Sequence, residues 1–144
     1  MQVQTYLLFD GRCDEALEYY HKAVGAEVEF LLRMKDTPGA NESGKLPPGA
    51  GDKVMHCSFR IGDTVILATD GGATSMDSFS GKPVFGGFQL TLSVATEAEA
   101  TRVFAALSDS GRVRQALTKT FFSPLFGMLT DRFGVAWIVM VPQQ

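Results

Sequence analysis

The stretch of sequence that decides the fold is Phe88–Leu107, FQLTLSVATEAEATRVFAAL. Its first seven residues alternate between apolar and polar side chains, which predicts a strand with one buried face. Residues 96–99 form a capping box, in which the Thr96 hydroxyl and the Glu99 carboxylate each satisfy a backbone N–H at the start of a helix. The apolar residues that follow at helical spacing are Ala100, Val103, Phe104 and Leu107. Because a strand and a one-sided helix have to bury their apolar surfaces together, this stretch predicts one β-α unit of a layered fold.

A second one-sided helix is expected from about Asp14 to Val24, and Gly25 supplies its end. Its apolar positions have the same spacing as those of the helix after Thr96, and they are Ala16, Tyr19, Tyr20 and Ala23. Eight short segments rich in Val, Leu, Ile, Phe and Thr predict strands. They are Val3–Phe9, Glu27–Arg33, Lys53–Ile61, Thr64–Thr69, Phe88–Val94, Arg112–Leu117, Leu125–Thr130 and Val135–Val141.

The order of these elements indicates a duplication. It reads β-α-β-β-β and then β-α-β-β-β again, which is typical of two diverged copies of one module. The first copy is longer by about the length of Asp36–Asp52, an insertion rich in Pro and Gly. We therefore expect a single domain over residues 1–144, built of modules at about 1–70 and 86–144 that are joined by a linker at 71–85.

Composition limits the classes of function. Of the 144 residues, 45% are hydrophobic and 20% are charged, which is typical of a globular protein. The net charge is −3 and no run of Lys or Arg occurs, so we expect no nucleic-acid partner. The longest apolar run, Val135–Val141, has seven residues, whereas a membrane-spanning helix needs about 20, so we expect no membrane partner. Two cysteines without a CxxC pair, and an N-terminus without the features of a signal peptide, favour a cytoplasmic protein.

Strand alternation also predicts a polar face on the sheet, because successive side chains point to opposite faces. His56, Ser58 and Arg60 share the face opposite the apolar positions of their strand. In the first strand, Tyr6 falls on the polar face if Val3 packs under the helix. The candidate side chains on this face are Gln4, Tyr6, His56, Ser58, Gln89 and Thr91. Polar groups that converge in a cup with aromatic walls suit a small-molecule site, whereas polar residues on one face of an antiparallel sheet usually face solvent.

His56 is the candidate catalytic residue, either as an acid–base group that titrates near neutrality or as a hydrogen-bond donor to a ligand. The alternative is a histidine whose ring is satisfied by Ser58 or by a backbone carbonyl. Arg60 and Asp70 are expected to form a surface ion pair at strand ends. Three roles are open for an apolar cluster near the C-terminus: packing in the core, forming a wall of the cup, or forming a dimer interface. The cluster comprises Phe121, Phe122, Phe126, Met128 and Phe133.

Several segments of the chain resemble one known family, among them Gly25–Glu27 and Ile61–Asp63. Tyr6–Gly11 leading into Glu15–Tyr20, Lys53–His56, and Thr120–Val135 are similar to the PhnB-like branch of the vicinal-oxygen-chelate (glyoxalase/bleomycin-resistance/dioxygenase) superfamily, over essentially the whole chain. The resemblance implies an α+β fold in which two βαβββ modules form a curved, barrel-like mixed sheet around a cup. It also implies a homodimer, because modules of this superfamily commonly pair edge to edge. Such sequences are often described as 3-demethylubiquinone-9 3-methyltransferases.

The resemblance further implies positions for a metal. Superfamily enzymes hold a divalent cation in the cup with His, Gln or Glu from the first and last strands of each module, and the cation polarises a substrate oxygen pair. On this chain those positions fall on Gln4 (or Thr5), Leu67 (or Ile66), Gln89 and Ile138. Two apolar residues stand where carboxylates are usual, and neutral amides alone compensate little for the lost hydration of a cation. We therefore expect no metal ligands and no cofactor; a divalent metal on Gln4, His56 and Gln89 is the alternative.

Three functions follow from these observations. The first is a protein that binds an unidentified small molecule in its cup without the usual metal-ligand set. The alternative is a metal-dependent enzyme of the lyase, dioxygenase or isomerase type that uses His56 with Gln4 and Gln89. The methyltransferase of the family description ranks last, because no glycine-rich loop follows the first strand and no acidic strand end suits S-adenosylmethionine. Whether the protein is an enzyme is left open by the sequence.

Overall fold

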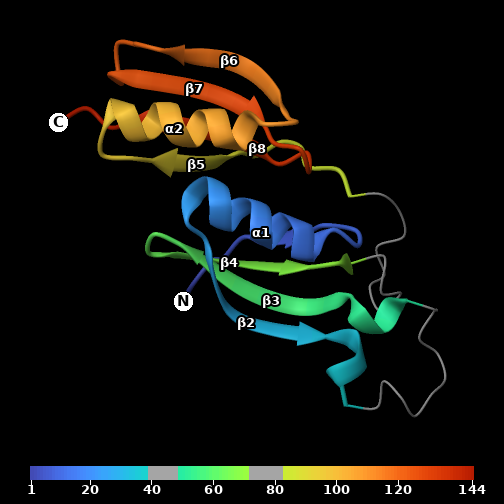
Figure 1. The fold of residues 1–144 in the computed structure, drawn as a ribbon. Coiled ribbons are helices and arrows are strands. Elements are labelled where there is room, and N and C mark those ends of the chain that lie inside the picture. The colour runs from blue at the N-terminus through green and yellow to red at the C-terminus, as the bar shows by residue number, and fades with distance from the viewer. Residues whose placement is uncertain (39–48, 72–82) are drawn as a thin grey trace. The chain divides into compact units, whose positions relative to one another are not determined.

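The chain follows the same order of elements twice (Figure 1). The computed structural model describes residues 1–38, 49–71 and 83–144. The first copy comprises β1 (Tyr6–Leu8), α1 (Cys13–Val24), β2 (Glu27–Arg33), β3 (Val54–Ile61) and β4 (Thr64–Thr69), with short 3₁₀ helices η1 (Met34–Asp36) and η2 (Ala50–Asp52) between β2 and β3. The second comprises β5 (Leu90–Ser93), α2 (Glu97–Ser108), β6 (Arg112–Thr118), β7 (Leu125–Thr130) and β8 (Ala136–Val141). The prediction of two β-α-β-β-β modules is confirmed.

The two copies are separate compact units, residues 1–83 and 84–144. Each contains one four-stranded mixed sheet, ordered β1-β4-β3-β2 in the first unit and β5-β8-β7-β6 in the second. In each sheet the first strand runs parallel to the last, and the other pairs are antiparallel. The sheets are curved, but neither closes into a barrel, because each keeps a strand at either edge. The α+β class is confirmed, and the single domain stays a prediction; its linker at 71–85 falls mostly outside the described residues.

The helices begin and end where local rules place them. The Glu99 backbone N–H donates to Thr96 Oγ1 at 3.1 Å, which confirms the expected cap of α2. Helix α1 ends at Gly25, whose φ of 71° is a left-handed conformation that glycine adopts without strain. Within the described part of the chain, neither 12-residue helix, α1 or α2, is long and apolar enough to cross a membrane.

The first strand is shorter than expected. Strand β1 begins at Tyr6, so Val3 lies outside it and is 95% exposed rather than packed under α1. Gln4 likewise precedes the strand. The predicted strand from Val3 is therefore wrong at its start, because the parallel pairing of β1 with β4 begins only where Tyr6 meets Leu67.

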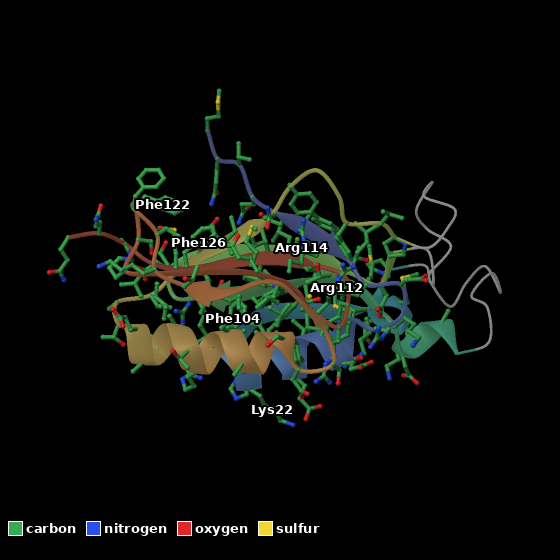
Figure 2. The ribbon with its side chains drawn as sticks, turned by 90° about the horizontal axis from the view of Figure 1, so that it is seen from above. Lys22, Phe104, Arg112, Arg114, Phe122 and Phe126 are labelled. Carbon is green, nitrogen blue, oxygen red and sulfur yellow. The ribbon has the colours of Figure 1, made fainter. Side chains whose placement is uncertain are left out.

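Each helix covers one face of its own sheet. In the first unit the ring of Tyr20, from α1, stacks on Phe59 of β3 with centroids 5.9 Å apart. In the second unit Phe104 projects from α2 toward the sheet, whereas Phe122 and Phe126 lie on the side away from α2 (Figure 2). The fully buried strand residues under the helices are Leu7, Cys57, Phe59, Ala68, Leu129 and Val139. On the opposite face of each sheet most side chains are half-buried or exposed.

Asp70 connects three elements of the first unit and is not the surface ion-pair partner of Arg60. Its side chain is buried, and its Oδ1 and Oδ2 accept hydrogen bonds from the backbone N–H groups of Cys13 (2.8 Å) and Val54 (2.7 Å). The residue after β4 thus holds the first residues of α1 and β3. The predicted pair with Arg60 is wrong, because Arg60 bonds instead to Glu27 and Glu29.

Replacement of Asp70 by Asn tests this connection. The Asn side chain has only one acceptor oxygen, so one of the two buried N–H groups loses its partner. We expect Asp70→Asn to lower the free energy of unfolding by about 1.5 to 3 kcal/mol, measured from the urea midpoint at constant m-value. Asp63→Asn, in the exposed turn between β3 and β4, is the matched control and should stay within about 0.5 kcal/mol of the parent. Equal midpoints for the two variants would contradict the assignment.

Gly127 of β7 allows α2 to approach its sheet. A Cβ at this position would lie 2.7 Å from Phe104 Cε2 and 3.0 Å from Leu117 Cδ2. Because the Phe104 ring is buried, we expect Gly127→Ala to destabilise the protein by about 1 to 3 kcal/mol in chemical denaturation. Gly86→Ala is the control, since a Cβ there meets no heavy atom within 4 Å. The packing argument fails if the two alanine variants unfold at the same midpoint.

Candidate functional site

The open face of the first sheet brings Tyr6, His56 and Ser58 together. Ser58 is paired with Leu67, and Leu67 with Tyr6, so these three side chains share one face of β3, β4 and β1. His56 lies two residues before Ser58 and points to the same face. The Tyr6 hydroxyl oxygen is 3.1 Å from His56 Nδ1, and the two rings stack with centroids 5.7 Å apart. The ring of Phe30, from β2, lies 6.2 Å from that of His56.

The hydrogen-bond partner of the His56 ring differs from those considered from the sequence, which were Ser58 and a backbone carbonyl. Its Nδ1 lies within hydrogen-bond distance of the Tyr6 hydroxyl, and within the described residues Ser58 is not bonded to it. Holding Nδ1 fixes the orientation of the ring and directs Nε2 away from Tyr6. A half-buried imidazole held in this way can accept a proton from a bound molecule or donate a hydrogen bond to it.

The open face of the second sheet carries a pocket of about 680 Å³. Its lining residues are Phe85, Gly86, Gly87, Phe88, Gln89, Arg114, Thr130, Gly134, Ala136 and Ile138. Gln89 immediately precedes β5, and Ile138 belongs to β8. Thr91 is paired with Ile138 and therefore shares its face, although it does not line the pocket. The segment before β5 thus forms one wall, with two aromatic rings, and the open sheet face forms the other.

Arg114 and Thr130 are pocket residues that the sequence analysis missed. Val113 is paired with Leu129 and Gln115 with Met128, so Arg114 is an extra residue in β6 without a partner in β7. Such a β-bulge re-aims the side chain and interrupts the alternation of faces along β6, a strand for which no faces were predicted. The sequence did contain one indication of a polar site here, because Arg112 and Arg114 flank a single Val at the start of a predicted strand.

The six predicted site residues divide between the two units. Gln4, Tyr6, His56 and Ser58 belong to residues 1–83, whereas Gln89 and Thr91 belong to residues 84–144. Tyr6, His56 and Ser58 are brought together on one face, as expected. Gln4 precedes β1 and is exposed. A common cup that joins both groups stays a prediction.

The donor set does not fit the metal of the superfamily. The strand register places Leu67 opposite Tyr6 and Ile138 opposite Thr91, so apolar side chains occupy the last-strand positions of both modules. In the described ranges no group of three or more His, Cys, Asp or Glu side chains is arranged to hold a metal ion. Neutral amides from Gln4 and Gln89 supply no charge to replace the missing carboxylates. No step of a mechanism is therefore derived through a metal.

The two cysteines are buried in the first unit, on the side of its sheet that α1 covers. Cys13 Sγ and Cys57 Sγ lie 3.7 Å apart, and both residues are fully buried between α1 and β3. The hydrogen bond to Cys57 and burial both raise the pKa of the Cys13 thiol. A protonated, inaccessible thiol is a poor nucleophile, so Cys13 does not serve as one in the folded protein.

The reactivity of the thiols can be measured directly with Ellman's reagent. We expect the native protein to release almost no thionitrobenzoate at neutral pH, and the protein in denaturing guanidinium chloride to release two equivalents, one for each cysteine. Cys13→Ala should halve the denatured yield and leave the native protein unreactive. A fast native reaction of either thiol would show that the pair is accessible.

The chain is similar to known proteins along its whole length. The model of a family described as 3-demethylubiquinone-9 3-methyltransferase matches residues 1–140. Protein YjdN of Escherichia coli (strain K12) is 31% identical over 149 residues, and the match covers 100% of this chain and 97% of YjdN.

Solved structures resemble the chain along its full length. Protein PA1353 from Pseudomonas aeruginosa is 35% identical with a TM-score of 0.80, covering 100% of this chain and 99% of that one. A putative 3-demethylubiquinone-9 3-methyltransferase, PhnB protein, from Bacillus cereus is 25% identical with a TM-score of 0.74, covering 98% and 99%. A glyoxylase/bleomycin resistance protein/dioxygenase domain from Frankia sp. EAN1pec, 14% identical, has a TM-score of 0.62 over 99% of this chain and 98% of that chain, and shares the fold.

Proposed function

The chain belongs to the family described as 3-demethylubiquinone-9 3-methyltransferase, the PhnB-like branch of the vicinal-oxygen-chelate superfamily, and we propose that it binds a small molecule without a metal. The observation that carries this proposal is the pocket of about 680 Å³ on the open face of the second sheet. Its volume lies within the range of about 300 to 1,000 Å³ that is typical of small-molecule sites. Its lining combines two phenylalanine rings with the polar side chains of Gln89, Arg114 and Thr130, which suits a small ligand that has both an apolar and a polar part.

His56 and Tyr6 are the proposed polar contacts of the first unit. Tyr6 holds the imidazole through Nδ1, which leaves Nε2 as the group that faces a ligand on the open side of the sheet. Ser58, on the same face, adds a hydroxyl two residues further along β3. A metal-free acid–base role for His56 is the second candidate function, favoured by this hydrogen bond. The homodimer and the cytoplasmic location stay predictions.

Methyl transfer, which the family description names, is not proposed for this chain. The turn after β1, Phe9-Asp10-Gly11-Arg12, contains a single glycine and no run that would cradle a cofactor. The carboxylate that closes β4, Asp70, is buried, and each of its oxygens already accepts a backbone N–H. It is therefore not available to bind the hydroxyls of a ribose.

Neutral aromatic probes test the pocket independently of ligand charge. We expect indole and phenol to shift the backbone amide resonances of the pocket residues, and to raise the free energy of unfolding by about 1.4 kcal/mol at ten times Kd. Gln89→Trp, an exposed position at the rim of the pocket, should fill the space and abolish both effects. Gln144→Trp, at the exposed C-terminus, is the matched control and should leave them unchanged. Shifts that are absent, or that survive in Gln89→Trp, would contradict the proposal.

A further inference from the structure

The first unit has a β-bulge in the strand that follows its helix. In β2, Val28 is paired with Phe59 of β3, and the next pair is Phe30 with Ser58. Glu29 is therefore an extra residue without an opposite partner. A bulge of this kind places its side chain beside that of a neighbour on the same face, instead of on alternate faces.

The second unit has its bulge at the equivalent place. In β6, Val113 is paired with Leu129 of β7 and Gln115 with Met128, so Arg114 is the extra residue. Both bulges follow the second residue of their strands, and both strands directly follow the helix of their unit. Glu29 and Arg114 therefore occupy equivalent positions in the duplicated fold.

At this place in the first unit, one positively charged side chain bonds to two negatively charged ones. Arg60 of β3 is opposite Glu27, the first residue of β2. Its guanidinium donates to Glu27 Oε2 at 2.6 Å and to Glu29 Oε1 at 3.1 Å. One cation thus lies between two carboxylates, one from the start of the strand and one from its bulge.

In the second unit the same two positions carry the opposite charge. Arg112 is paired with Thr130, as Glu27 is paired with Arg60 in the first unit. Arg114 occupies the position that is equivalent to Glu29. The equivalent of Arg60 is therefore an uncharged threonine. Figure 2 places Arg112 and Arg114 close together along β6, with Arg114 on the side of the sheet away from α2.

No acidic side chain balances these two arginines in the described part of the second unit. Asp109 pairs with Arg132. Asp131 is buried, and its carboxylate accepts hydrogen bonds from Trp137 Nε1 and from backbone N–H groups. The remaining carboxylates, Glu97 and Glu99, lie in the first turn of α2. The pocket itself is lined by Arg114 and Thr130 and by no acid.

We propose that the second unit binds an oxyanion between Arg112 and Arg114, as part of an aromatic ligand that occupies the pocket. In the second unit the negatively charged group of the ligand occupies the position that Arg60 occupies in the first. An anion then lies between two arginines, where the first unit has a cation between two glutamates. Guanidinium groups suit this role because they present paired N–H donors to a carboxylate or phosphate. The proposal rests on the proposed function and adds to it the chemical class of the ligand.

The pocket determines what the rest of the ligand is. Phe85 and Phe88 flank the space next to Arg114, and Ile138 contributes its apolar side chain from β8. A flat ring with an acidic substituent satisfies both parts, because the ring packs on the phenylalanines while its oxygens reach the arginines. Benzoate is the smallest such probe, and benzamide is nearly the same shape without the charge.

Amide chemical-shift titrations at constant ionic strength compare the two probes. We expect benzoate to shift pocket resonances and to bind at least about tenfold more tightly than benzamide, which corresponds to about 1.4 kcal/mol. Arg114→Gln should reduce this ratio to near one, and Arg112→Gln should reduce it in part. Arg102→Gln, an exposed charge change on α2, is the matched control and should preserve the ratio. Inorganic phosphate should shift residues 112–114 without the phenylalanines, in a manner that also requires Arg114.

The outcomes separate the two proposals. Equal binding of benzoate and benzamide in the pocket would overturn the oxyanion site and leave the proposed function standing. A benzoate preference that survives in Arg114→Gln would also overturn it, because the anion would then be held elsewhere. If neither benzoate nor phosphate shifts these residues, the oxyanion site is refuted, and the separate result with indole and phenol decides whether the pocket binds small molecules.

Discussion

A single helix covers each four-stranded sheet, and this one-sided cover is the constraint on which the rest of the structure depends. A sheet of this size exposes two faces, and the apolar residues of each strand are sufficient for only one of them. In β3 the consequence is visible residue by residue, because Cys57 and Phe59 are fully buried while His56 and Ser58 are half-buried. The face without a helix is where polar and aromatic side chains meet, so the packing rule that forms the core also determines where the proposed ligand site lies.

The parts of the fold that depend on local rules could be predicted from the sequence. The cap at Thr96 follows from hydrogen-bond chemistry within four residues, and the structure contains it. The assignment of His56 and Ser58 to the open face follows from a period of two along a regular strand. The duplication was also visible, because two helices with the same apolar spacing begin equivalent runs of elements. In each case neighbouring residues contain the information.

The remaining features depend on residues that are far apart in sequence. The partners of Asp70 are 57 and 16 positions away, and no local pattern indicates that its carboxylate accepts their N–H groups. The bulge at Arg114 could not be predicted, because it is a property of the pairing of β6 with β7 and not of β6 alone. The start of β1 was misplaced for the same reason, since only the pairing with β4 determines that the strand begins at Tyr6. Register is a tertiary property, and the sequence pattern constrains it only where one face is clearly apolar.

The duplication also changes how the charge of the protein is interpreted. The net charge of −3 argues against a polyanionic partner, and it holds for the chain as a whole. Over residues 84–144, however, five Lys and Arg stand against four Asp and Glu, so the acidic excess belongs to the first unit. At Glu29 and Arg114, which are the extra residues of equivalent bulges, the two units carry charges of opposite sign. Two arginines in one strand, one of which lines the pocket, are too few to attract a nucleic acid, but they are sufficient for one carboxylate or phosphate, which limits the proposed ligand to a small anion.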